Sequence, residues 1–141
     1  MRKVTTFIFG AALAVLAMAG SAWAQEDTAT LIKQLREDTD RFEKTLNTAL
    51  DRSPIDGTKA EDEINRYVRE FEYAIGKFKK NWENDGDAKG WAGEVMVRGR
   101  ALDRFLKKHT DQLSSPVHTD WETVKLDIGR IAKANNVKAK W

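Results

Sequence analysis

The sequence predicts an all-α protein, an antiparallel up-down four-helix bundle. Apolar residues recur at steps of three and four along most of residues 25–141, which is the period of an amphipathic helix. Turn-forming residues interrupt this pattern at three places, and no segment alternates strictly enough for a strand. Four such helices joined by short loops pack most simply as an up-down bundle. A three-helix bundle with a peripheral fourth helix is the alternative.

Residues 1–24 have the features of a secretory signal peptide. Arg2 and Lys3 form a positive start, an uncharged apolar stretch follows, and Ala22-Trp23-Ala24 provides the small residues of a cleavage site. The apolar stretch is shorter than the roughly 20 residues that span a bilayer. We therefore expect cleavage before Gln25, which leaves residues 25–141 as one domain.

This cleavage changes the charge of the chain. The whole chain has 24 basic and 22 acidic residues, and removing Arg2 and Lys3 makes the formal net charge zero. A neutral chain gives no indication of nucleic-acid binding. The chain also has no cysteine, so it can have neither a disulfide nor a lipoprotein anchor. We expect a soluble exported protein, periplasmic or extracellular, with no stable membrane anchor.

The first two helices are the most regular. The first is predicted over residues 28–51 and ends before Pro54 and the Asp56-Gly57 turn. The second is predicted over residues 59–84, with Thr58 and Glu61 at capping-box spacing. Their apolar stripes are Ile32, Leu35, Thr39, Phe42, Leu46 and Ala49, and then Ile64, Val68, Phe71, Ile75, Phe78 and Trp82.

The other two helices are less regular. The third is predicted over residues 89–111, with a flexible entry because Gly90 and Gly93 weaken helix formation. Residues 113–118 are predicted to form a loop. The fourth helix is predicted over residues 120–134, behind a second capping box at Thr119 and Glu122. A short basic tail ending in Trp141 follows.

The sequence offers little catalytic or metal-binding chemistry. The histidines, His109 and His118, have Leu106 and Ser115 three positions earlier, so the Glu-x-x-His pairs of di-iron bundles are missing. Nucleophile and phosphate-loop motifs are also missing. We therefore predict no enzyme activity, no cofactor, and no catalytic or metal-binding residues.

The tryptophans form the candidate interaction surface. Trp82, Trp91 and Trp121 lie on apolar stripes near predicted helix ends, and Trp141 ends the chain. Core packing is the competing interpretation, because tryptophan fills large volumes while its N–H reaches the rim. With a helix beginning at residue 120, Trp121 is expected at the end of the bundle opposite Trp82 and Trp91. Trp141 is expected to be either docked on the bundle or exposed.

Several segments resemble a small family of exported bacterial helical-bundle proteins of unassigned function. The resemblance rests on residues 49–53, 56–58 and 61–65, and on an ending built on Trp121, Asp127-Ile128 and Ile131-Ala132. It implies a short periplasmic helical bundle and supplies no catalytic residues.

The leading hypothesis is a non-enzymatic exported protein that binds an envelope protein or an unfolded client. One alternative is a small-ligand or cofactor binder that uses the bundle core, and another is a membrane-surface-active protein. The sequence leaves the oligomeric state open.

Overall fold

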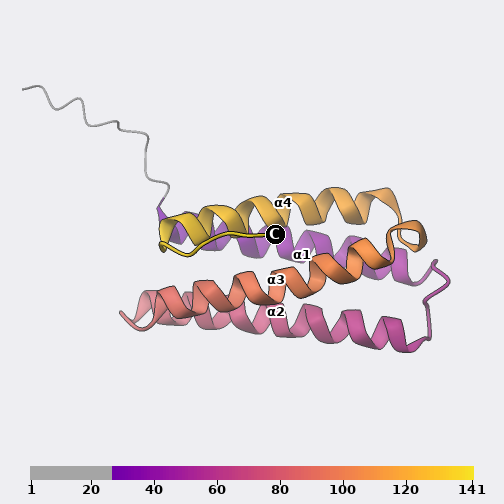
Figure 1. Cartoon of the computed structure of the whole chain (residues 1–141), viewed down its shortest axis with the longest axis horizontal. Helices are drawn as coiled ribbons and strands as arrows, with labels where there is room; N and C mark the ends of the chain where they lie inside the picture. The colour runs from indigo at the N-terminus through magenta and orange to yellow at the C-terminus, as the bar shows by residue number, and fades with distance from the viewer. Residues whose placement is uncertain (1–26) are drawn as a thin grey trace, which may run out of the picture.

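The computed structural model describes residues 27–141, which form an all-helical bundle (Figure 1). The predicted signal peptide, residues 1–24, lies outside the described residues. The helices are α1 (Thr28–Leu50), α2 (Lys59–Glu83), α3 (Ala88–Lys108) and α4 (Ser115–Ala134), and a 3₁₀ turn η1 (Thr110–Gln112) precedes α4.

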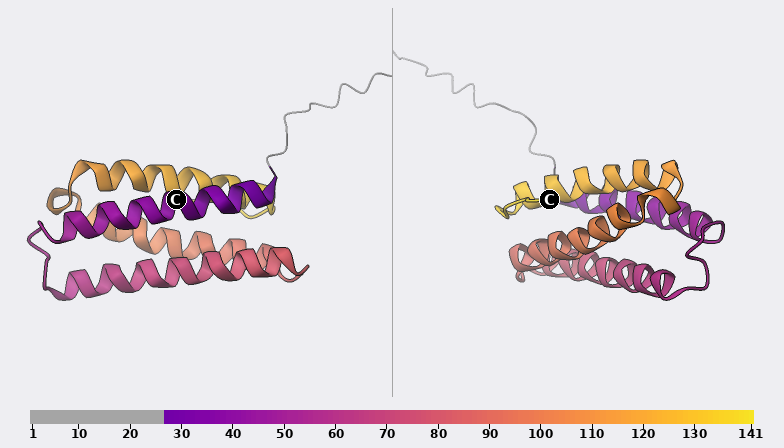
Figure 2. Two further views of the ribbon diagram at one scale, coloured as in Figure 1. Left: turned by 180° about the vertical axis from the view of Figure 1, so that it is seen from behind. Right: turned by 45° about the vertical axis from the view of Figure 1, so that its right-hand side comes forward.

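Consecutive helices run in opposite directions, which confirms the predicted four-helix bundle (Figures 1 and 2). The helices form two closely packed pairs, α1 with α4 and α2 with α3. The two pairs then stack, and the α1–α2 side is the least closely packed of the four sides. The fourth helix is an integral layer of the bundle, so the three-helix alternative does not describe this fold.

All four helices contribute large apolar side chains to one core. Phe42 from α1, Phe71 and Phe78 from α2, and Trp121 from α4 are each at most 2% exposed. Phe42 and Phe71 both lie against the Trp121 ring, with centroid separations of 5.1 Å and 6.0 Å. The hydrophobic effect on these side chains holds the two helix pairs together.

Side-chain caps fix the starts of the first three helices. Asp27 accepts from the N–H of Ala29, and Thr58 accepts from the N–H of Ala60. Glu61 reaches back to the N–H of Gly57 at 2.7 Å, one residue before the position that a standard capping box uses. The capping signal therefore locates the start of α2 correctly.

The start of α3 differs from the predicted flexible entry. The Asp87 carboxylate accepts from the N–H of Gly90 at 2.8 Å and caps the helix. A Cβ at Gly90 would lie only 2.1 Å from that carboxylate. Gly90 therefore allows the cap to form and does not mark a frayed turn.

The start of α4 also differs from the prediction, by five residues. The helix begins at Ser115 rather than at 120, with Ser114 as N-cap and Pro116 in the first turn. Proline is well tolerated there because the first N–H groups of a helix lack intrahelical partners. The predicted capping box at Thr119 is wrong, since the Thr119 hydroxyl donates to the Ser115 carbonyl inside the helix. His118, predicted in a loop, belongs to α4.

Candidate functional site

The structure distributes the four tryptophans over three places rather than one. Trp82 is half-buried on the α1–α2 side of the bundle. Trp91 is half-buried against Tyr73, with a ring separation of 6.1 Å. Trp121 and Trp141 meet edge to face at 6.4 Å. These positions do not form one aromatic surface.

Trp121 lies beneath the surface rather than on it. Because α4 begins at Ser115, Trp121 occupies its second turn and not its first residue. Its side chain is 2% exposed, and its indole N–H donates to Asp103 at 3.1 Å. Trp141 is 46% exposed and is docked on the bundle, which answers the question that the sequence left open.

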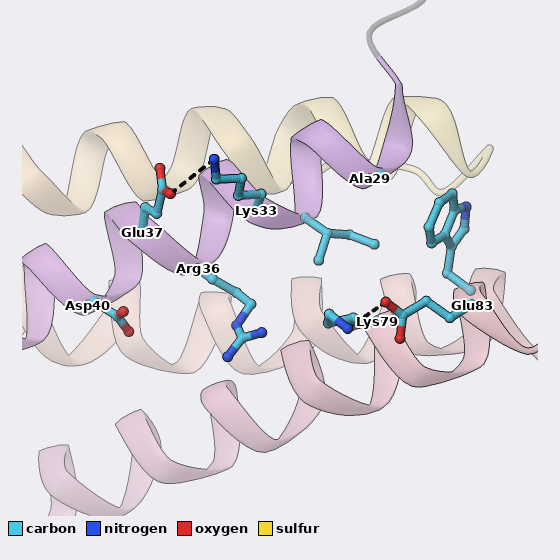
Figure 3. Close-up of a pocket in the computed structure, with 9 residues that line it drawn as sticks. Ala29, Lys33, Arg36, Glu37, Asp40, Lys79 and Glu83 are labelled. Atoms are coloured by element: carbon cyan, nitrogen blue, oxygen red, sulfur yellow. Dashed lines mark hydrogen bonds and ion pairs between the residues drawn. The ribbon is translucent and has the colours of Figure 1, made fainter.

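A groove between α1 and α2 is the candidate binding site. It encloses about 310 Å³ near the start of α1 and the end of α2, and Figure 3 shows the residues that line it. The half-buried Trp82 and the nearly buried Ile32, which is 3% exposed, form the apolar part of the groove, and charged side chains surround them. The charged lining residues are Lys33, Arg36, Glu37, Asp40, Lys79 and Glu83.

Most of these charges are already paired along their own helices. Lys33 pairs with Glu37 at 3.7 Å on α1, and Lys79 pairs with Glu83 on α2 (Figure 3). Arg36 instead extends from α1 into the space between the two helices (Figure 3). The groove therefore has an apolar centre with a rim of mixed charge.

A second hollow of about 190 Å³ continues the groove toward the middle of the bundle. It shares Arg36 and Asp40 with the first hollow and adds Glu72 and Gly76 from α2. From Ala29 to Asp40 the two hollows follow α1 for about 17 Å at the helical rise per residue. A Cβ at Gly76 would contact nothing within 4 Å, so the glycine leaves this wall open.

Three carboxylates gather at this inner end of the groove. Partial burial, then charge repulsion and a hydrogen bond with Glu43, and then repulsion from Asp40 raise the pKa of Glu72 to about 7. At neutral pH the Glu72 carboxyl is therefore partly protonated. A cationic group entering the groove here would favour its ionised form.

On the opposite side of the bundle, between α3 and α4, a buried carboxylate is surrounded by hydrogen-bond donors. Asp103 is 5% exposed and receives bonds from the Trp121 indole, from Lys107 at 2.6 Å and from Lys125 at 3.2 Å. Burial raises the pKa of Asp103, but these three hydrogen bonds outweigh burial, and the net pKa is lowered. Asp103 is therefore a fully partnered structural carboxylate.

Lys125 completes this network. Its Nζ also binds Glu122 at 2.6 Å. Burial lowers the pKa of Lys125, but the hydrogen bonds to Glu122 and Asp103 outweigh burial and raise the net pKa. Both partners of the Asp103–Lys125 pair thus keep their charges.

Sequence reasoning identified none of these carboxylates as functional candidates. The only sequence signal at Asp103 is its i,i+4 spacing to Lys107. Glu72 directly follows the core residue Phe71, but nothing in one helix indicates that its neighbours come from another. Both clusters are cross-helix contacts, which a periodic pattern does not encode.

The comparisons with known proteins add no further constraint. No family model, curated protein or solved structure matches this chain. None of the four described helices has the length and apolar character that crossing a bilayer requires. Within residues 27–141, no group of three metal-ligating side chains is placed to hold a metal ion.

Proposed function

We propose that this chain is an exported, non-enzymatic binding protein of the cell envelope, and that it holds a segment of a partner protein in the α1–α2 groove. The observation that carries the proposal is the groove itself. It combines apolar surface at Ile32 and Trp82 with a cluster of carboxylates in which partial burial, and then repulsion from Glu43 and Asp40, raises the pKa of Glu72. It also lies on the least closely packed side of the bundle.

The groove specifies the chemistry of the partner segment. An apolar side chain fits against Ile32 and Trp82, and a lysine or arginine fits at the Glu72 end. From Trp82 to Glu72 the groove follows α2 for about 15 Å, which matches about three turns of helix. An amphipathic helix with an apolar residue near one end and a basic residue near the other is therefore the preferred occupant.

The alternative of a cofactor in the bundle core has less support. The centre of the bundle is occupied by Phe42, Phe71 and Trp121, and both phenylalanine rings pack against the tryptophan ring. The hollows that line α1 and α2 open at the surface instead. A partner that contacts the outside of the helices agrees better with this geometry.

Photo-crosslinking from position 76, in the wall of the groove, is the first test of the proposal. A photo-crosslinking residue at position 76 should capture a partner in the envelope, and the same residue at Gly129 of α4 should not. A Cβ at either glycine would meet nothing within 4 Å, so neither change disturbs the core. The crosslinked segment should contain both an apolar and a basic residue.

The affinity of the purified protein for the captured segment is the second test. Gly76→Leu should weaken binding of the captured segment at least tenfold, whereas Gly129→Leu should leave it unchanged. Equal affinity in the two variants would reject the groove as the binding site. Capture of many unrelated segments would favour an unfolded client over a dedicated envelope partner.

A further inference from the structure

The C-terminal tail turns back along the bundle after α4. Asn136 has a left-handed φ of 53°, and the N–H of Val137 donates to the Ala132 carbonyl at 2.8 Å. This is the hydrogen-bond pattern of a Schellman reversal. The chain therefore ends near the middle of the bundle rather than beyond its end (Figures 1 and 2).

The reversal places the Trp141 ring in a cleft made by α3 and α4. Its ring stands nearly perpendicular to that of Trp121, at 87° and a centroid distance of 6.4 Å. The Nζ of Lys125 lies 5.6 Å from the Trp141 centroid, within the range of a cation–π contact. We call this place, formed by Gly99, Trp121, Lys125 and Ile128, the indole cleft.

Gly99 is what gives the cleft its room. A Cβ at this position would lie 3.4 Å from the Trp141 ring and 2.9 Å from Cδ1 of Ile128. The same Cβ would approach the Phe71 ring to 3.7 Å. A side chain on residue 99 would therefore compete for the space that the indole uses.

The tail is held at only two points. Val137 packs against the core and Trp141 fills the cleft. Within the described residues, no hydrogen bond or ion pair holds Lys138, Ala139 or Lys140. Trp141 keeps 46% of its surface exposed. The partly buried indole of Trp141 is therefore the main contact that holds the end of the tail, and the entropy lost in ordering the tail opposes it.

We propose that the indole cleft is a second binding site, specific for an aromatic side chain of a partner polypeptide, and that Trp141 occupies it as a ligand from the same chain. The Trp121 edge, the Lys125 ammonium and the space above Gly99 together suit a flat aromatic ring. The helices α3 and α4 lie on the side of the bundle opposite α1 and α2 (Figure 1), so the indole cleft and the α1–α2 groove are separate places. This inference therefore does not depend on the function proposed for the groove.

The tethered tail sets the condition under which a partner binds. A short flexible tether gives its ligand an effective concentration in the millimolar range. A partner aromatic must therefore either bind more tightly than Trp141 or arrive when the tail is released. Removing the Trp141 ring should open the cleft to external ligands.

The experiment uses the full chain with Trp141→Ala and an acetylated peptide that copies residues 137–141. Nitrogen-15 spectra would follow the indole N–H of Trp121, which the Asp103 contact keeps in a distinct environment. In the variant, the peptide should move this resonance back toward its wild-type position. The peptide should bind the variant at least fivefold more tightly than it binds the wild-type chain.

Two controls make the outcome decisive. A peptide with alanine in place of its tryptophan should cause no shift, and the variant Trp91→Ala should bind the original peptide no better than wild type. An unchanged Trp121 resonance in Trp141→Ala, or equal peptide affinity in wild type and variant, would overturn the proposal. Circular dichroism before the titration establishes that the variant retains its helices.

Discussion

The α3–α4 side and the α1–α2 side of this bundle both contain a carboxylate near a helix interface, but they treat it in opposite ways. Asp103 receives three hydrogen bonds, from Trp121, Lys107 and Lys125, and its pKa is lowered. Glu72 shares its surroundings with two other carboxylates, and its pKa is raised to about 7. A carboxylate thus links α3 to α4 on one side of the bundle, whereas carboxylates repel one another on the α1–α2 side.

This contrast explains why the α3–α4 side, here called the closed side, differs from the α1–α2 side, here called the open side. Opposite charges on α3 and α4 draw the two helices together over Trp121, and the C-terminal tail covers the remaining cleft. Like charges on α1 and α2 oppose closer approach, and surface hollows remain between these helices. The α1–α2 side therefore has surface hollows that a partner can contact.

The largest test of the closed side is Trp121→Ala. The ring is almost fully buried and contacts Phe42, Phe71 and Trp141. Its removal should lower the free energy of unfolding by about 3–5 kcal/mol. Urea denaturation followed by circular dichroism measures this loss. Trp141→Ala is the control and should cost less than about 1.5 kcal/mol, because its ring is half exposed. Similar losses in both variants would refute a central role for Trp121.

The Asp103 network provides the second test. Asp103→Ala leaves the Trp121 N–H and the largely buried Lys125 ammonium without their carboxylate, which should cost about 2–3 kcal/mol at pH 7. The exposed Asp56→Ala is the control and should change stability by less than about 0.5 kcal/mol.

The pH dependence of this loss follows from the lowered pKa of Asp103. Its stabilising contribution is fully present above the ordinary value of 3.8 and is lost as the pH falls through the lowered folded-state pKa. The stability difference between wild type and Asp103→Ala should therefore shrink in acid. A difference that stays constant down to pH 2 would contradict the ionised network.

Residue periodicity predicted the bundle because the core positions of one helix follow from its own sequence. Every stripe residue of α1, from Ile32 to Ala49, is buried in the structure. The start of α4 was missed because Thr119 and Glu122 matched a capping box, while residues 113–118 around Pro116 were predicted to form a loop. Proline in a first turn and proline in a loop have the same local sequence signal, and tertiary contacts at Val117 decide between them.

The grooves and carboxylate clusters were not predictable in the same way. The raised pKa of Glu72 depends on Glu43 and Asp40, which belong to a different helix, so it requires the relative rotation of α1 and α2. The docking of Trp141 depends on a glycine 42 positions earlier, at residue 99. Such contacts follow from packing between elements, on which one sequence gives no periodic signal.

The open side is tested by Glu72→Gln. The folded pKa of Glu72 exceeds its ordinary value of 4.5, so its contribution to stability is greatest below pH 4.5 and declines as the pH rises to about 7. Glutamine cannot ionise and avoids this decline. Allowing for solvent screening, the variant should be about 1 kcal/mol more stable than wild type at pH 8 and unchanged at pH 4.

Denaturation at these two pH values measures the effect. Glu37→Gln is the matched control, because Glu37 lies on the outer rim of the same groove and pairs with Lys33. It should show no such gain at pH 8. An equal change in stability at pH 8 for the two variants would show that repulsion within the carboxylate cluster does not keep this side open.

The smallest test compares a glycine on each side. Gly76 and Gly99 are both inside helices, where alanine is favoured by roughly 0.5–1 kcal/mol through helix propensity. At Gly76 a Cβ meets nothing within 4 Å, so Gly76→Ala should gain this full amount. At Gly99 the Cβ would lie 2.9 Å from Ile128, whose side chain would have to move, so Gly99→Ala should gain nothing. Thermal denaturation should therefore raise the midpoint only for Gly76→Ala. An equal rise in both variants would mean that the α3–α4 side has as much free space as the α1–α2 side, and the contrast between a closed and an open side would fail.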